Sequence, residues 1–249
     1  MSHNRLDRSA IAPELRRIER RLMLKGALSL GGLSMLSGCA LDDEPSVERA
    51  LSAMSRFTDR MQALLFSRQR LAREFDASRI THPFPFNAYY DESEVRTVDP
   101  TGWRLDVGGL VSDKRPWSLA QFRALPQKRQ ITRHICVEGW SAIGDWSGVP
   151  LSIFLQKVGA DLRAKYVNFR CFDDYSTSID MATALHPQTI LALDYGDRAL
   201  PPAYGAPMKV RIPTKLGYKN PKYLASIEVT NRFPGGYWED QGYDWFGGS

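Results

Sequence analysis

This chain of 249 residues contains little cysteine and histidine and lacks several common cofactor motifs. Its three cysteines and four histidines form no CxxC pair, no CxxCH haem-attachment sequence and no spacing typical of zinc ligands. A GxGxxG dinucleotide fingerprint is also absent. These absences argue against a zinc protein, an iron–sulfur protein, a c-type cytochrome and a Rossmann dehydrogenase.

A long apolar run is missing from the N-terminal region as well. Residues 26–38 (GALSLGGLSMLSG) carry no charge but are too short and too rich in Gly and Ser to span a bilayer, which takes about 20 apolar residues. Arg20 and Arg21, followed by LMLK, precede this stretch in the manner of a twin-arginine signal. The stretch ends in LSGC at Cys39, a sequence similar to the lipobox of bacterial lipoproteins.

We therefore expect residues 1–39 to be an export signal of the twin-arginine type, with Cys39 lipidated and the protein anchored to a membrane in the periplasm. An uncleaved signal anchor, or a short apolar helix with an incidental cysteine, is the alternative. The twin-arginine route carries proteins that fold before export, which suits a protein loaded with a cofactor in the cytosol.

After the expected signal, neither positive nor negative charge is in excess. The whole chain has a formal net charge of +5, and residues 1–39 contain seven Lys or Arg against three Asp or Glu. The remainder has 26 basic and 25 acidic residues, which is close to neutral. The sequence shows no basic helix or aromatic–basic stripe either, so we expect no nucleic-acid partner.

The chain after Cys39, about 210 residues, is long enough for one domain with a substantial core. We expect a helical linker over residues 40–80, because apolar residues recur there in steps of three and four, at Val47, Leu51, Met54, Phe57, Met61, Leu64 and Leu65. This helix either docks on a membrane partner or packs on its own domain. The domain itself is expected over residues 81–249.

Within that domain, strand and helix patterns mix without a regular βαβ period, which predicts an α+β fold of mixed sheets and short helices. Ser118 is a candidate cap for a helix over 119–125, and Gly159 a candidate terminator for a helix over 150–159. We expect a turn in the Gly- and Trp-rich stretch after Cys136. Predicted strands lie at 103–111 (with a kink at Gly109), 130–137, 165–172, 208–212 and 224–230.

Three separated segments carry a resemblance to a known family: FNAYYDE (86–92), RHICVEGWS (133–141) and LPPAYGAPMKVRIPTKLGYKNPKYL (200–224). They resemble the molybdopterin domain of the sulfite oxidase superfamily, and within it the catalytic subunits of periplasmic methionine sulfoxide reductases. Agreement in three places in the same order is far more specific than one short motif.

The resemblance implies a molybdenum–molybdopterin cofactor whose metal is held by the thiolate of Cys136. A thiolate suits a soft ligand position, and a single cysteine leaves coordination sites free for oxygen transfer. A buried structural thiol, or a disulfide to Cys171 in an exported protein, is the alternative. His134 is a candidate catalytic proton donor or a structural histidine, and Trp140 and Trp146 are expected in the pocket wall.

The resemblance also implies a set of pterin contacts. Lys209 stands where the relatives have an arginine, Cys171 where they have a threonine and Tyr204 where they have an asparagine. The basic run 215–222 has the composition of a phosphate cradle, although a solvated basic loop would look the same. The expected cofactor-binding residues are Asn87, Tyr90, Asp91, Cys171, Tyr204, Lys209, Asn220, Pro221 and Lys222.

The implied activity is a two-electron oxygen-atom transfer, most simply the reduction of a small-molecule or protein-bound S-oxide or N-oxide. Because the sequence shows no second redox site, electrons would come from a membrane b-type cytochrome or a quinone-linked donor. A sulfite-oxidase-like oxidase and a cofactor-free periplasmic lipoprotein that serves as a binding module are the alternatives. Arg133, Arg170 and Lys215 are candidates for binding an anionic substrate.

Overall fold

The computed structural model describes residues 54, 57–58, 61–62 and 70–249. The chain divides into two compact units, Met1–Arg56 and Phe57–Ser249, and the fold below is that of the second. The expected signal, Cys39 and most of the predicted linker helix lie outside the described residues. Within the predicted helix the described residues Met54, Phe57, Thr58, Met61 and Gln62 are helical.

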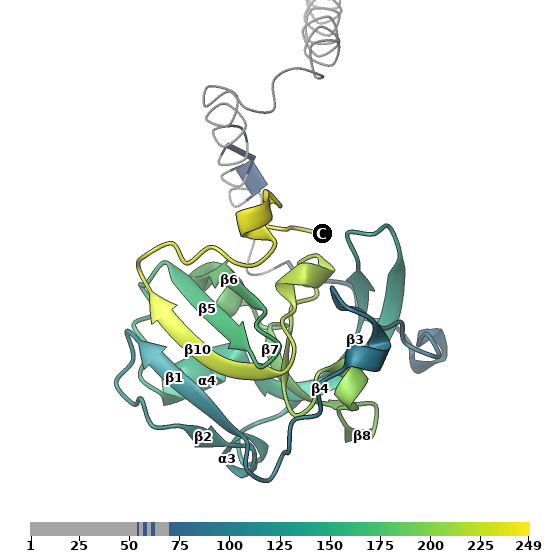
Figure 1. Ribbon diagram of the computed structural model, residues 1–249, viewed down its shortest axis with the longest axis horizontal. Helices are drawn as coiled ribbons and strands as arrows, with labels where there is room; N and C mark the ends of the chain where they lie inside the picture. Colours follow the sequence, from purple (N-terminus) through teal and green to yellow (C-terminus); the bar gives the residue numbers. More distant parts are fainter. Residues whose placement is uncertain (1–53, 55–56, 59–60, 63–69) are drawn as a thin grey trace, which may run out of the picture. The chain divides into compact units, whose positions relative to one another are not determined.

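Two five-stranded sheets form the unit (Figure 1). In the first, β1 and β10 pair in parallel and the other neighbours are antiparallel. In the second, all pairs are antiparallel, and β7 pairs with both β4 and β9. The first sheet has the order β2 (Trp117–Ser118), β1 (Arg104–Gly109), β10 (Leu224–Thr230), β5 (Tyr166–Cys171), β6 (Ser176–Asp180). The second has the order β3 (Lys128–Ile135), β4 (Ser141–Pro150), β7 (Ile190–Tyr195), β8 (Arg198–Ala199), with β9 (Lys209–Arg211) beside β7.

Within residues 70–249 the helices are short. They are α3 (Leu119–Arg123), α4 (Leu151–Lys157), α5 (Met181–Ala184) and the 3-10 turns η1 (Ala77–Arg79), η2 (Glu92–Glu94), η3 (Pro202–Tyr204), η4 (Gly217–Lys219) and η5 (Glu239–Gln241). None of them has the length and apolar content needed to cross a bilayer. Mixed sheets with few short helices confirm the predicted α+β class.

Both sheets contribute to one large buried core. Leu105, Val167 and Ile227 enter it from the first sheet, and Val149 and Leu191 from the second. A smaller cluster around Phe84 and Trp146 lies on the second sheet. Because the two sheets share buried side chains, the loops at their ends are held in fixed positions.

Most predicted elements are confirmed. Ser118 caps α3 through a full capping box with Gln121. Gly159 follows α4 with φ +63°, a left-handed conformation in which glycine carries no steric penalty. Gly109 ends β1 at φ +76°, where a Cβ would lie 2.0 Å from the carbonyl oxygen of Val229. The five predicted strands all form, within one or two residues of their expected bounds.

The predicted turn after Cys136 is wrong beyond Trp140. Residues 141–150 form β4, a central strand, and its glycines serve close packing instead of a turn. A Cβ on Gly148 would lie 2.0 Å from the carbonyl oxygen of Leu191 on the neighbouring strand β7. Glycine inside a strand marks such a close approach of another backbone.

Residues 70–80 differ from the expected helical linker. The backbone N–H of Phe75 donates to the carbonyl of Ile131 at 2.9 Å, and Glu74 forms an isolated β-bridge with Thr132. This segment therefore joins the edge of β3 instead of continuing a helix. The pairing supplies partners for backbone groups that an edge strand would otherwise leave open.

Candidate active site

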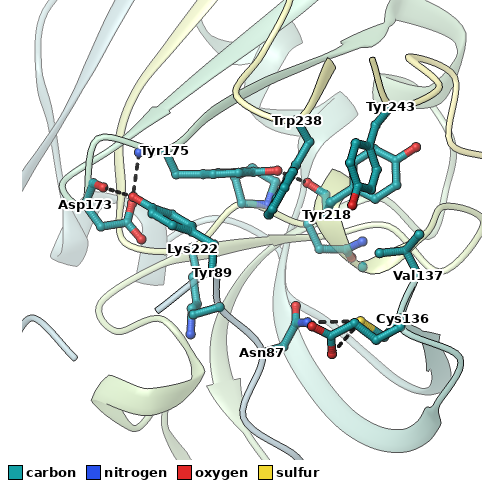
Figure 2. A pocket seen from close by; sticks show the side chains of 15 residues that line it. Asn87, Tyr89, Cys136, Val137, Asp173, Tyr175, Tyr218, Lys222, Trp238 and Tyr243 are labelled. Atoms are coloured by element: carbon teal, nitrogen blue, oxygen red, sulfur yellow. Dashed lines mark hydrogen bonds between the residues drawn. The ribbon is translucent and has the colours of Figure 1, made fainter. Parts of the chain in front are cut away.

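A pocket of about 650 Å³, part of it open to solvent, lies where five chain segments meet (Figure 2). Its lining comes from the segment 87–89, the loop after β3, the turn after β5, the η4 loop and the C-terminal segment. Two carboxylates, one lysine and several aromatic rings line the pocket beside Cys136. Figure 2 labels Asn87, Tyr89, Cys136, Val137, Asp173, Tyr175, Tyr218, Lys222, Trp238 and Tyr243.

Cys136 lies directly after β3, in a tight loop. Its N–H donates to the carbonyl of Trp140 at 2.9 Å, its carbonyl accepts from Gly139 at 3.2 Å, and Gly139 has φ +92°. The Asn87 amide donates to the sulfur (Nδ2–Sγ 3.3 Å), and the thiol donates to Oε2 of Glu138 at 3.6 Å. Burial raises the pKa of the Cys136 thiol, while the Asn87 amide acts in the opposite direction.

Both cysteines of the domain are free. Cys136 lies in the pocket loop, whereas Cys171 is buried at the end of β5, paired with Leu224 of β10. The alternative of a Cys136–Cys171 disulfide is therefore wrong. Burial and the nearby Asp173 carboxylate raise the pKa of the Cys171 thiol far above its ordinary value, as expected of an unreactive thiol.

His134 is buried two residues before Cys136 on β3. Neither of its ring nitrogens has a hydrogen-bond partner among the described residues, although the side chain is almost fully enclosed. A Cβ on Gly217 would lie 2.8 Å from His134 Nε2 and 3.6 Å from Asn87 Oδ1, so these two side chains meet around the glycine. Burial, Arg211 and Lys209 together lower the pKa of His134 well below its usual value, which keeps the ring neutral.

Three cations are buried near this histidine: Lys209, Arg211 and Lys222. Within the described part of the chain no carboxylate lies within 4.0 Å of any of them. Burial lowers the pKa of Lys222 to about 8 and of Arg211 to about 9, and that of Lys209 well below its ordinary value. Buried charges normally require a partner of opposite sign.

Backbone geometry brings the two lysines together. Lys209 and Lys222 form an isolated antiparallel bridge, and Gly205 packs against both, since a Cβ there would lie 2.6 Å from Lys222 Cβ. Lys222 Nζ donates to the Ala203 carbonyl at 3.0 Å, and Lys209 Nζ lies 4.9 Å from the ring centre of Trp146. Neither of these contacts is an ion pair.

A molybdopterin fits this set of groups. Its phosphate would supply an anion for the buried cations. Its polar ring edge suits the ring nitrogens of His134, which have no hydrogen-bond partner among the described residues. A metal suits the free thiol of Cys136. Asn87, Cys136, Asn220, Pro221 and Lys222 are the predicted site residues that line the pocket. The Asn220 amide is already engaged, since Oδ1 accepts from Arg211 at 2.9 Å and from the Ile212 N–H at 2.7 Å.

Three other predicted contacts, Tyr90, Asp91 and Tyr204, do not line the pocket. Tyr90 donates to Asp173 Oδ2 at 3.0 Å, and Tyr204 donates to the carbonyl of Phe84 at 3.1 Å. Asp91 is exposed, and its carboxylate caps η2 by accepting from the Ser93 N–H at 2.9 Å. Contacts of these three side chains with the cofactor stay predictions.

The expected phosphate cradle over 215–222 is only partly formed. Lys222 faces the pocket, whereas Lys215 donates to the carbonyl of Phe246 at 2.7 Å and Lys219 forms a buried ion pair with Glu239. All three lysines are buried, so the alternative of a solvated basic loop is wrong too. The C-terminal segment supplies partners that composition alone does not reveal.

The expected wall and substrate residues also lie elsewhere. Trp146 is buried beneath Lys209, and the ring of Trp140 stacks obliquely on His134 at 5.6 Å. Arg133 is exposed, with its guanidinium 5.3 Å from the ring of Phe75, and Arg170 is exposed on β5. Neither these two arginines nor Lys215 lines the pocket.

Sequence reasoning missed several site residues. Arg211 lies two residues after Lys209 on β9 and therefore faces the same side, a signal present in the alternation of MKVRI. Asp173 lines the pocket from the turn CFDDY, where burial raises the pKa of its carboxyl. For Gly205, Gly217 and the aromatic rings of the C-terminal segment, no local sequence pattern indicates a place in the site.

Comparison with known proteins agrees with this site. The model of the oxidoreductase molybdopterin binding domain family matches residues 92–238. The putative protein-methionine-sulfoxide reductase subunit YedZ1 of Azospira oryzae is 64% identical over 230 residues, which cover 92% of this chain and 88% of that protein. The protein-methionine-sulfoxide reductase catalytic subunit MsrP of Burkholderia mallei is 28% identical, over 94% of this chain and 76% of its own.

Among solved structures, the sulfane dehydrogenase SoxCD from Paracoccus pantotrophus superposes with a TM-score of 0.52 at 17% identity. The match covers 55% of this chain and 40% of that one, and it shows a shared fold. The free thiol in the pocket and the buried cations suit the molybdopterin named in the family description. The chain therefore belongs to the oxidoreductase molybdopterin-binding domain family and is a molybdopterin-dependent oxidoreductase of the sulfite oxidase type.

Proposed function

We propose that this oxidoreductase reduces S-oxides, with methionine sulfoxide held in proteins as the leading substrate. One observation carries the proposal: a free thiol at Cys136 borders a pocket beside three buried cations that have no carboxylate within 4.0 Å among the described residues. The names of two relatives, both called protein-methionine-sulfoxide reductases, support the substrate class. N-oxides are a second class that the same chemistry would accept.

When bound, the molybdenum–molybdopterin cofactor would supply the two-electron centre at which an oxygen atom is removed from the substrate. Cys136 would hold the metal as a thiolate, with Asn87 donating to its sulfur. Lys209, Lys222 and Arg211 would compensate the phosphate charge. His134, neutral and buried, suits a hydrogen bond to the cofactor better than proton exchange with solvent.

The overall reaction would consume two electrons and two protons and release the thioether and one water, so that the S=O bond breaks and sulfur is reduced. Protons would enter through the two carboxylates that line the pocket, Glu138 and Asp173. The buried Asp173 carboxyl has a raised pKa and therefore retains a proton more readily than an ordinary aspartate. Electrons would arrive singly from a membrane b-type cytochrome or a quinone-linked donor.

We further propose that the protein is exported folded by the twin-arginine route and anchored in the periplasm through a lipid on Cys39. Arg20, Arg21 and the LSGC sequence support this location. Replacement of both arginines by lysine should retain the protein in the cytosol, and Cys39→Ala should release it from the membrane fraction. Unchanged fractionation of both variants would contradict the proposal.

The test of function is purification from a host with an active twin-arginine pathway, followed by elemental analysis and assay. We expect about one molybdenum per chain and oxidation of a reduced viologen dye that depends on methionine sulfoxide. Oxidation of sulfite without reduction of any S-oxide or N-oxide would indicate the sulfite-oxidase-like alternative. A protein without molybdenum in that host would indicate a binding module.

A further inference from the structure

The C-terminal segment forms one wall of the pocket. Trp238 and Tyr243 line it, although the last strand, β10, ends at Thr230. Figure 2 shows their rings near Tyr218, on the side of the cavity that lies across from Asp173. Cys136 and Asn87 lie below these rings in the same view. The C-terminal rings and Cys136 therefore line the same pocket.

The rings of this wall support one another. The centroid of Tyr243 lies 4.9 Å from that of Trp238 and 5.8 Å from that of Tyr218. Among the lining residues, Tyr243 is 37% exposed and Val137 49% exposed, so both present surface to solvent beside the cavity. We call Trp238, Tyr243 and Tyr218 the aromatic wall.

Several contacts hold the wall in place. Lys219 and Glu239 form an ion pair with exposed fractions of 0% and 3%, and the Thr177 hydroxyl donates to Glu239 Oε1 at 2.5 Å. Tyr218 donates to the carbonyl of Asp244 at 2.5 Å. Because Lys219 and Tyr218 belong to η4, the C-terminal segment is tied to the loop whose next residues, 220–222, line the cofactor side of the pocket.

A methionine sulfoxide side chain matches this wall chemically. Its methyl and methylene groups are apolar and can pack on aromatic rings. The wall residues themselves carry no formal charge, so they discriminate by shape and apolar contact.

We propose that Trp238 and Tyr243 determine substrate specificity by binding the methylene and methyl groups of a peptide-bound methionine sulfoxide, with Lys219 and Glu239 as positioning residues for this wall. The inference rests on the proposed S-oxide reductase activity. It goes beyond that activity because it assigns substrate selection to the C-terminal segment.

The test compares Trp238→Ala and Tyr243→Ala with wild type on two substrates, an acetylated peptide containing methionine sulfoxide and dimethyl sulfoxide. Each lost ring should reduce kcat/KM for the peptide about three- to tenfold, mainly through a higher KM. The ratio of kcat/KM for the peptide to kcat/KM for dimethyl sulfoxide should therefore fall. Phe233→Ala is the matched control, an exposed ring of the same segment outside the pocket. Trp238→Phe should restore most of the ratio.

A second readout does not need turnover. Calorimetric titration with the same peptide carrying methionine sulfone, which is not reduced at this site, should show Kd raised by a similar factor in both alanine variants. Glu239→Gln should raise KM for the peptide more than KM for dimethyl sulfoxide if the ion pair positions the wall.

The outcomes separate the two proposals. Wild-type protein that contains molybdenum but reduces no S-oxide or N-oxide would refute the proposed function, and the specificity inference with it. An active wild type whose alanine variants keep the peptide-to-dimethyl sulfoxide ratio, or lose both activities equally, would overturn the inference alone. Unchanged Kd for the sulfone peptide would overturn it independently of catalysis.

Discussion

The side-chain amide of Asn87 donates a hydrogen bond to the sulfur of Cys136, with 3.3 Å between Nδ2 and Sγ, across 49 residues of sequence. The two residues come from the proline-rich segment before η2 and from the end of β3. A thiolate accepts such a bond more strongly than a thiol does, so Asn87 favours the form that binds a metal. The contact joins two of the three segments that carry the family resemblance.

Replacement of Cys136 by alanine should remove the metal and the activity. The pocket contains no second thiol, and a methyl group cannot ligate molybdenum. We expect a molybdenum content below about a tenth of wild type and no measurable S-oxide reduction. Cys171→Thr is the control, since Cys171 does not line the pocket, and it should retain most of its molybdenum. Normal metal content in Cys136→Ala would refute the ligand assignment.

Replacement of Asn87 by alanine should raise the pKa of the Cys136 thiol in cofactor-free protein, because the amide lowers it. At pH 8 the thiolate fraction, and with it the alkylation rate by iodoacetamide, should fall by up to about tenfold. Mass spectrometry of the peptide containing Cys136 separates this thiol from the others. An unchanged or faster rate would show that Asn87 does not stabilise the thiolate.

His134 should make the fold sensitive to acid. Its native pKa lies well below the ordinary value of 6.5, so the unfolded chain binds a proton first as the pH falls, and stability decreases below pH 6.5. Between pH 7.5 and pH 5.5 this costs about 1.4 kcal/mol, a loss that His134→Gln should abolish. Urea unfolding of both proteins at the two pH values measures it, and equal pH dependence would contradict the prediction.

Gly205 should be required for cofactor retention. It has φ +111°, and a Cβ would lie 2.6 Å from Lys222 Cβ, so Gly205→Ala should displace a buried lysine of the site. Gly196→Ala is the matched control, because Gly196 has φ +60° but nothing within 4 Å of the added carbon. Both variants should lose about 1 kcal/mol of stability through the backbone conformation, but only Gly205→Ala should lose molybdenum. Equal molybdenum content would refute the assignment.

The Lys219–Glu239 pair should show strong coupling in unfolding experiments. Removal of one partner leaves a buried charge, so Lys219→Met and Glu239→Leu should each cost about 3 kcal/mol or more. The double variant Lys219→Met/Glu239→Leu should recover much of this loss, because no unpaired charge remains. Additive losses in the double-mutant cycle would show that the two charges do not depend on each other.

Local patterns were sufficient for much of the fold. The Ser118 cap, the helix end at Gly159 and the strands β9 and β10 depend on residues close in sequence, and all formed as predicted. The predicted turn after Trp140 was wrong because Gly148 is required by the close approach of the backbone of β7, which lies more than 40 residues away in sequence. In the sequence, a glycine that is required by a distant strand cannot be distinguished from a glycine that is required by a turn.

The site residues likewise fall into those that the sequence predicts and those that only the folded structure reveals. Cys136, Asn87 and Lys222 follow from motifs in the sequence, and the pocket contains all three. Lys215 and Lys219 have the same composition signal as Lys222, yet they contact the C-terminal segment. The sequence by itself determined the fold class and the family and predicted the ligand thiol, because these depend on local patterns and short motifs. Tertiary structure alone decided which buried cations lack carboxylates and which rings close the pocket, because charge pairing and burial depend on neighbours that only the folded chain brings together.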